Sequence, residues 1–207
     1  MDDDNSLNQP KTAAIPALID VVRAIAENGR KNTGEKYQRS FFDVAKTPDN
    51  LKDIGLVGEK FTIPYGTISR HFGKDEDHEL TEEEWQRIPS AILTPFAITK
   101  YYSDKNHQRQ RGFRLYTDIS KGNGYIVIGV DVKSVNQGKG KPVSLINSIS
   151  TIFGKDGRLS TVEEEIYRSK KINPQQASLL ERPNSSQYPF VGDSDCKDNT
   201  IFQNTSE

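Results

Sequence analysis

The first pattern along the chain is a helical repeat of apolar side chains. Its members are Ile15, Leu18, Ile19, Val22, Ile25 and Ala26. Pro16 suits a first helical turn and Asn28-Gly29 is a stop signal, so the spacing predicts a helix over residues 15–28. The apolar face of this helix either packs on a core or docks on a partner chain. Residues 29–39 are polar and contain glycine, which predicts a linker.

The next segment predicts a short helix and a strand. Thr47 followed by Pro48 is typical of an N-cap with proline at the first helical position, and Gly55 or Gly58 ends the helix. Residues 61–63 are phenylalanine, threonine and isoleucine, a composition typical of a strand.

The clearest local signal in the chain begins at Leu80. Thr81 can cap a helix while Glu84 reaches back to the cap, and Leu80 can pack on Trp85. Pro89 follows within the same apolar repeat, so the sequence predicts that the helix breaks or restarts there.

Four segments rich in β-branched and aromatic residues predict strands. They span residues 95–102, 112–119, 124–135 and 143–156. The first three are separated by loops whose lengths suit antiparallel hairpins. The last segment carries Thr151 and Lys155 near its end, where a strand leaving a sheet can hold a hydroxyl and an ammonium beside a cleft. The alternative is a core strand followed by a simple Gly-Lys turn.

The C-terminal third predicts one more strand or helix at residues 165–172. Asn173-Pro174 then opens a short helix that ends at Leu180. The expected fold is α+β, with N-terminal helices packed on a roughly four-stranded antiparallel sheet. The expected organisation is a tail and amphipathic helix at 1–40, a folded domain at 41–173 and a polar, flexible tail at 174–207.

Composition adds a few limits. The chain has 207 residues with 28 Lys plus Arg and 29 Asp plus Glu, so any nucleic-acid surface must be local. The single cysteine, Cys196, allows no internal disulfide. No apolar run approaches the roughly 18 residues of a membrane span, and the acidic residues 2–4 are unlike the basic start of a signal peptide. We expect a soluble, cytoplasmic protein, or one delivered to the cytoplasm from a virion or a secretion system.

Several landmarks follow one another along residues 41–173. They are Thr47-Pro48 with Ile54-Gly55-Leu56, Asp77-His78 before Leu80-Thr81, Ile88-Pro89 with Leu93-Thr94-Pro95, the ISTIFGKD of residues 149–156, and Ile166-Tyr167 before Lys170-Lys171. In this order and spacing they resemble the C-terminal domain of phage MuF-type minor head proteins. That family is placed with the barnase, EndoU, colicin and RelE group of metal-independent nucleases, in which N-terminal helices precede a four-stranded antiparallel sheet.

The resemblance implies catalytic roles for three residues. His78 stands at the family's histidine before the helix, and Lys155 stands at its lysine after the glycine. Thr151 keeps a hydroxyl where the family more often has serine. Phe153 replaces the usual tyrosine, so any role of a phenol at that position is lost in this chain.

RNA cleavage without a metal needs a base near the 2′-hydroxyl, an acid for the leaving oxygen and cations on the phosphate. Among His71, His78 and His107, the first choice for proton transfer is His78, although a histidine in its position can equally be a solvated loop residue. The densest basic patch either binds phosphates or forms a solvated hairpin tip. Its members are Lys100, His107, Arg109, Arg111 and Arg114.

Other chemistry finds little support in the sequence. Lys139-Gly140-Lys141 lacks the rest of a P-loop, and the histidines and the single cysteine have no metal-ligand spacing. We therefore expect no metal and no cofactor.

These patterns predict an endoribonuclease-like domain of toxin type, derived from a phage or mobile element, that cleaves RNA without a metal ion. Its expected partners are RNA and either a cognate inhibitor or a phage protein, with no membrane. The alternative is a catalytically inert, phage- or virion-associated binding module on the same fold, with residues 15–28 as its docking helix. Phe153 and the near-zero net charge favour this alternative.

Overall fold

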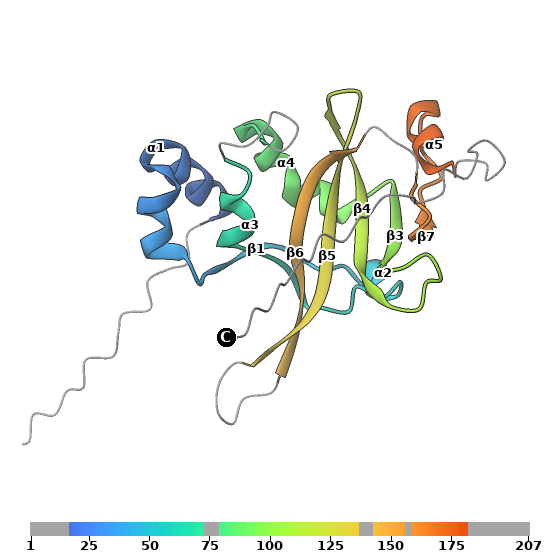
Figure 1. Ribbon diagram of the computed structural model, residues 1–207, viewed down its shortest axis with the longest axis horizontal. Coiled ribbons are helices and arrows are strands. Elements are labelled where there is room, and N and C mark those ends of the chain that lie inside the picture. Colours follow the sequence, from blue (N-terminus) through green and yellow to red (C-terminus); the bar gives the residue numbers. More distant parts are fainter. Residues whose placement is uncertain (1–16, 73–78, 137–142, 156–158, 182–207) are drawn as a thin grey trace, which may run out of the picture.

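The computed structural model describes residues 17–72, 79–136, 143–155 and 159–181. The strands in this part are β1 (Phe41–Lys46), β2 (Lys60–Pro64), β3 (Ala97–Tyr102), β4 (Gln110–Lys121), β5 (Gly124–Asn136), β6 (Val143–Lys155) and β7 (Glu163–Arg168). The helices are α1 (Leu18–Tyr37), α2 (Asp49–Lys52), α3 (Tyr65–Ser69), α4 (Glu82–Leu93) and α5 (Pro174–Leu180). The strands form one seven-stranded sheet in the order β1-β2-β6-β5-β4-β3-β7 (Figure 1).

The middle of the sheet matches the predicted strands, but the sheet as a whole does not. β3, β4, β5 and β6 are antiparallel neighbours in chain order, as the hairpin loops predicted. β2, however, pairs with β6 in parallel, with Phe61 opposite Asn147. The expected four-stranded antiparallel sheet behind N-terminal helices, of the barnase and RelE type, is therefore wrong. The fold is a mixed sheet of seven strands with helices before, between and after them.

The additional strands pair with the two outer strands of the central four and so provide hydrogen-bond partners for their backbones. An edge strand presents a row of unpaired N–H and C=O groups, which favours the addition of further strands. β2 pairs along β6 and β7 pairs along β3, with Tyr101 of β3 opposite Glu163 of β7. The C-terminal segment that the sequence left open between helix and strand is thus a strand.

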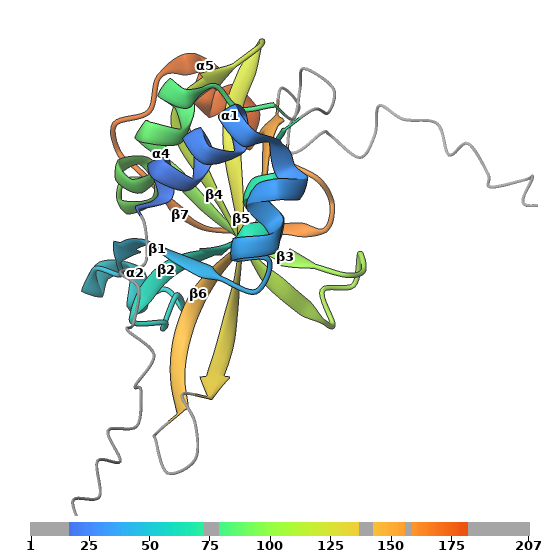
Figure 2. The ribbon, with the colours of Figure 1, turned by 90° about the vertical axis from the view of Figure 1, so that its left-hand side faces the viewer.

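Alternate residues along the central strands face two separate cores, because successive side chains of a strand point to opposite faces. The larger core lies with α1, α3 and α4 and includes Ile98, Leu115, Ile128 and Ile152. The smaller core lies with α5 and includes Ala97, Tyr116, Val127 and Leu179. The second face stays open around Thr151, which is exposed. β5 and β6 also extend past the rest of the sheet as a two-stranded arm (Figure 2).

Helix α1 packs on the larger core and is longer than predicted. Its apolar residues Leu18, Val21, Val22 and Ile25 are buried there, so this stripe is not an exposed docking surface. Gly29 has a φ of 75° and bends the helix, but helical structure resumes and reaches Tyr37. The predicted linker at 29–39 is therefore wrong. No helix in the described part of the chain has the length and apolar character needed to cross a membrane.

Helix α4 begins with the predicted capping box. The Thr81 hydroxyl accepts a hydrogen bond from the Glu84 N–H at 3.2 Å, and the Glu84 carboxylate accepts one from the Thr81 N–H at 2.7 Å. The predicted break or restart at Pro89 is wrong, because α4 runs through this residue. Trp85 and Ile92, on either side of the proline, are buried, and their packing offsets the backbone hydrogen bond that proline cannot make.

A buried asparagine fixes the segment between α2 and β2. The Asn147 amide donates hydrogen bonds to the carbonyls of Leu56 and Gly58, at 3.1 and 3.2 Å. It also donates to the Thr47 hydroxyl at 2.9 Å, and its oxygen accepts from the Gly58 N–H at 3.1 Å. Thr47 therefore serves this contact and does not cap α2, whose N-cap is Pro48, so the predicted threonine cap is wrong.

We expect Asn147→Ala to lower the free energy of unfolding by about 3 kcal/mol, because several buried polar groups lose their partner at once. Urea unfolding followed by fluorescence of the buried Trp85 measures the change. The control is Asn32→Ala, whose exposed amide donates only to the Asn28 carbonyl and should change stability by at most about 0.5 kcal/mol. Equal unfolding midpoints for the two variants would contradict the role assigned to Asn147.

Candidate functional site

Two glycines hollow the open face of the sheet. Gly129 of β5 lies between Arg114 of β4 and Thr151 of β6 in the strand register. A Cβ at Gly129 would lie 2.5 Å from the Thr151 methyl group, and a Cβ at Gly112 would lie 2.5 Å from the Val130 carbonyl oxygen. No side chain therefore rises from the sheet between Arg114 and Thr151.

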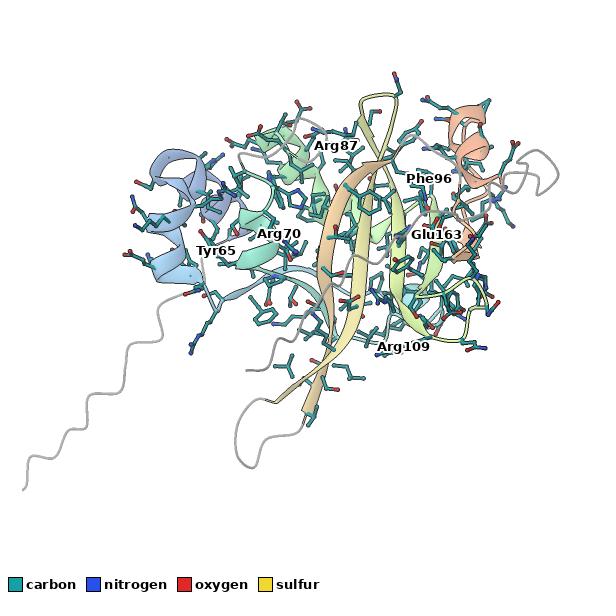
Figure 3. The ribbon with its side chains drawn as sticks, in the orientation of Figure 1. Tyr65, Arg70, Arg87, Phe96, Arg109 and Glu163 are labelled. Carbon is teal, nitrogen blue, oxygen red and sulfur yellow. The ribbon has the colours of Figure 1, made fainter. Side chains whose placement is uncertain are left out.

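The hollow forms a cavity of about 460 Å³, which we call the arginine cavity. Its lining consists of Tyr101, Arg109, Gln110, Arg111, Gly112, Phe113, Arg114, Gly129, Val130, Asp131, Ser150 and Thr151. The lining includes three arginines and one acidic residue, Asp131, whose carboxylate lies 3.8 Å from the Lys133 ammonium. Arg70, the residue that follows α3, donates to the Ser150 carbonyl at 2.9 Å. In the view of Figure 3, Arg70 and Arg109 lie on either side of β5 and β6.

Arg114 is the most constrained of the three arginines in the lining. Its Nη1 donates to the Glu163 carboxylate at 2.7 Å. Its guanidinium carbon lies 4.0 Å from the centre of the Tyr101 ring and 5.5 Å from that of Phe153. Arg109 and Arg111, by contrast, are exposed. The cavity thus combines one guanidinium in a fixed position with two that extend into solvent.

Glu163 fixes Arg114 from a fully buried position beside β3. One of its oxygens accepts hydrogen bonds from Arg114 and from the Tyr116 hydroxyl at 2.8 Å. The other accepts from the Lys155 ammonium at 2.8 Å and from the Ser160 N–H at 2.7 Å. Burial alone would raise the pKa of Glu163, but the hydrogen bond and charge of Lys155 outweigh it and lower the pKa to about 2.

Lys155 completes this buried cluster. Its ammonium donates to Glu163 and, at 3.0 Å, to the Tyr116 hydroxyl, and its side chain is only 11% exposed. Burial lowers the pKa of Lys155, while the contact with Glu163 acts in the opposite direction. Burial and the neighbouring Glu163 charge raise the pKa of Tyr116, so its phenol stays protonated and donates to the carboxylate.

The structure brings four of the predicted site residues together. The arginine cavity is lined by Thr151, Arg109, Arg111 and Arg114. Lys155 lies on the same strand as Thr151, but its ammonium contacts Glu163 and Tyr116. Lys100 lines a second cavity, which shares Arg111 with the first.

The described histidines lie apart from the arginine cavity. His107 stacks on Tyr102 with ring centres 4.4 Å apart, and its Nε2 lies 2.9 Å from the Thr161 carbonyl oxygen. His71 is buried with its ring edge-to-face against Trp85. His78 lies outside the described residues, so its catalytic role stays a prediction. Within the described residues, no group of three or more His, Cys, Asp or Glu side chains could hold a metal ion.

Sequence reasoning missed Glu163, Tyr101 and Gly129. A glycine inside the β-branched run of residues 124–135 is a signal of close backbone approach, and it could have indicated Gly129. No local signal separates Glu163 from the two glutamates that follow it. The register of β7 on β3 selects Glu163, by placing it opposite Tyr101.

The fold and the cavity define a domain built on a seven-stranded mixed sheet, with an arginine-lined site on an open face of that sheet. The family model described as the phage MuF-C-terminal domain matches residues 69–175. The chain belongs to this family and is phage-associated, which confirms the family predicted from the sequence landmarks. The match spans the whole lining of the arginine cavity but begins after the landmark at residues 47–56. No curated protein and no solved structure matches the chain.

Acid should remove the stability that Glu163 contributes. Because the pKa of Glu163 falls from 4.5 to about 2 on folding, the contribution is complete above pH 4.5 and is lost as the pH falls through about 2. At roughly 1.4 kcal/mol per pKa unit it amounts to about 3 kcal/mol. Urea unfolding at a series of pH values between about 5 and 2 measures this slope.

In Glu163→Gln this part of the pH dependence should be absent. The variant should also be less stable at pH 7, since Lys155 and Arg114 remain near a neutral amide. The exposed Glu83→Gln serves as the control and should keep the slope of the wild type. An unchanged slope in Glu163→Gln would show that other carboxylates carry the acid sensitivity.

Proposed function

We propose that this phage-associated domain binds single-stranded RNA at the arginine cavity and cleaves its backbone without a metal ion. The observation that carries the proposal is the convergence of three arginines with the Ser150 and Thr151 hydroxyls around one cavity. In this function the chain is an endoribonuclease-like hydrolase of toxin type, in the group that includes barnase, EndoU, colicin and RelE.

The charge of the cavity supports a phosphate ligand. Guanidinium groups bind phosphate oxygens through paired N–H donors, and such charge-assisted bonds are stronger than neutral ones. Within the described residues, Arg114 donates one hydrogen bond to Glu163 through Nη1, and a guanidinium has five N–H donors, so others can face a ligand. Arg109 and Arg111 can close on the same phosphate from solvent, because both are exposed.

The size and polarity of the cavity support a single strand. A volume of about 460 Å³ lies in the range of sites for small ligands and suits a nucleotide rather than a duplex. Hydroxyl groups can bond the ribose 2′-hydroxyl, the group that distinguishes RNA from DNA. Ser150 and Thr151 supply such hydroxyls beside the arginines.

The chemistry follows from these positions. In the cleavage we propose, His78 takes the proton of the RNA 2′-hydroxyl, and the 2′-oxygen attacks the adjacent phosphorus to form a 2′,3′-cyclic phosphate. The bond from phosphorus to the 5′-oxygen breaks, the 5′-oxygen takes the proton back from His78, and negative charge grows on the phosphate oxygens in between. Arg114 and the Thr151 hydroxyl lie on either side of Gly129, where they can stabilise that charge. Proton transfer is assigned to His78, because Glu163 is buried and both its oxygens already accept hydrogen bonds. Lys155 acts through Glu163, which fixes Arg114.

A binding module without cleavage is the second candidate. Phe153 favours it, because this position offers only an apolar ring, and that ring packs near the Arg114 guanidinium. In this case the arginine cavity holds a phosphate-bearing ligand and releases it unchanged.

Arg109→Gln combined with Arg111→Gln should weaken the binding of single-stranded RNA by about 100-fold, because each charge-assisted hydrogen bond contributes roughly 1.5 kcal/mol or more. The slope of log affinity against log salt should fall by roughly 0.7 for each phosphate that the variant no longer neutralises. Fluorescence anisotropy of a labelled oligoribonucleotide measures both. The control is Arg87→Gln on α4, whose side chain pairs only loosely with Asp118 at 3.5 Å (Figure 3). Equal weakening in both variants would mean that RNA affinity depends on the overall positive charge of the surface and not on this cavity.

Cleavage of a mixed RNA pool in EDTA tests the reaction itself. We expect His78→Ala to lower the rate by about 100-fold or more, as loss of a general acid or base does, and Thr151→Val to lower it by roughly tenfold. The control is Thr161→Val, an exposed threonine away from the cavity lining. RNA binding without cleavage by the folded wild type would leave the binding module as the function. Equal rates in all variants would identify a contaminant.

A further inference from the structure

A larger cavity of about 670 Å³ lies against the opposite face of β4. Its apolar wall consists of Ile54, Val57, Phe113, Val132 and Ile166. Phe113 belongs to the core beneath the helices, whereas its neighbour Arg114 points to the arginine cavity. We call this second space the apolar cavity.

The wall of the apolar cavity is preformed. Gly55 has a φ of 109°, and a Cβ there would lie 3.0 Å from the Phe113 ring, so only glycine lets the chain pass so close. The Asn147 amide holds the carbonyls of Leu56 and Gly58 just beyond it. The segment that carries Ile54 and Val57 is therefore fixed before any ligand binds.

The exposed part of the wall is apolar with a cationic rim. Val57 is 47% exposed and lines the cavity. Lys100 and Arg111 stand at the rim with one carboxylate, Asp53. The described residues place no carboxylate within 4.0 Å of the Lys100 ammonium. The cavity suits a ligand with a flat apolar body next to a negative charge.

The two cavities share lining residues at the start of β4. Both are lined by Gln110, Arg111, Gly112 and Phe113. Arg111 is exposed and therefore reaches either side of the strand. A ligand whose phosphate is held by Arg111 in the arginine cavity therefore lies next to a residue that also lines the apolar cavity.

We propose that the apolar cavity receives the nucleobase of a nucleotide whose phosphate lies in the arginine cavity. This inference rests on the proposed function, and it adds a base subsite to a site described so far only by its phosphate contacts. The base lies against the apolar wall at Val57, and Asp53 and Gln110 face its polar edge, as in other sites that bind splayed-out bases of single strands. Arg111, which lines both cavities, contacts the phosphate that links it to the chain, and Lys100 lies on the side of the base.

Two small probes separate the base from the phosphate. Adenosine 5′-monophosphate and ribose 5-phosphate carry the same phosphate and differ by the base. By calorimetric or NMR titration, the wild type should bind the nucleotide at least about tenfold more tightly than the sugar phosphate. Val57→Ser should reduce that advantage several-fold and leave the affinity for ribose 5-phosphate unchanged. Val143→Ser is the matched control, because Val143 is an exposed valine on the β5–β6 arm, and the advantage should persist there.

The outcomes distinguish this inference from the function on which it rests. Equal affinity for the two probes, with both weakened in Arg109→Gln/Arg111→Gln, would overturn the base subsite and leave phosphate binding in place. An advantage that Val57→Ser does not reduce would place the base elsewhere and overturn the subsite as well. Failure of both probes and of single-stranded RNA to bind would overturn both proposals.

Discussion

The structure depends on one buried carboxylate. Glu163 joins β7 to the centre of the sheet and accepts hydrogen bonds from Lys155 and Arg114, two cations on different strands. Such a cluster is stable only while every member keeps its partners, because removal of one leaves an uncompensated buried charge. The cluster has two positive charges and one negative charge. Arg114, which lines the arginine cavity, is 19% exposed, against 11% for Lys155.

The same interactions explain why the site lies where it does. α5 and its apolar partners cover one part of the second sheet face. On the remaining part, Gly112 and Gly129 place no side chain above the strands. A side chain at either glycine would meet the neighbouring strand, so the hollow is a consequence of close strand approach. The arginines around it come from one hairpin, β3–β4, and the hydroxyls come from β6. Strand pairing therefore brings these arginines and hydroxyls together.

Features encoded in short segments could be predicted, and features set by pairing could not. The capping box at Thr81, the four central strands and the basic patch with Arg109 and Arg111 all follow from local patterns. The parallel pairing of β2 with β6 could not be predicted, because it joins Phe61 to a residue far along the chain, Asn147. The same limit applies to the site. Glu163 is one of three successive glutamates, and only the register of β7 decides which of them is buried.

The segment matched by the family model contains the lining of one cavity but only part of the lining of the other. Residues 69–175 contain the whole lining of the arginine cavity together with Lys155 and Glu163. The apolar cavity, in contrast, is completed by Asp53, Ile54 and Val57, which precede that segment. Phosphate contacts thus lie within the part that defines the family, whereas the wall that would receive a base is built by the preceding part and held in place by Asn147. In the arrangement we propose, strands within the family match bind the anion, and the segment packed against them sets the selectivity for the group that the anion carries.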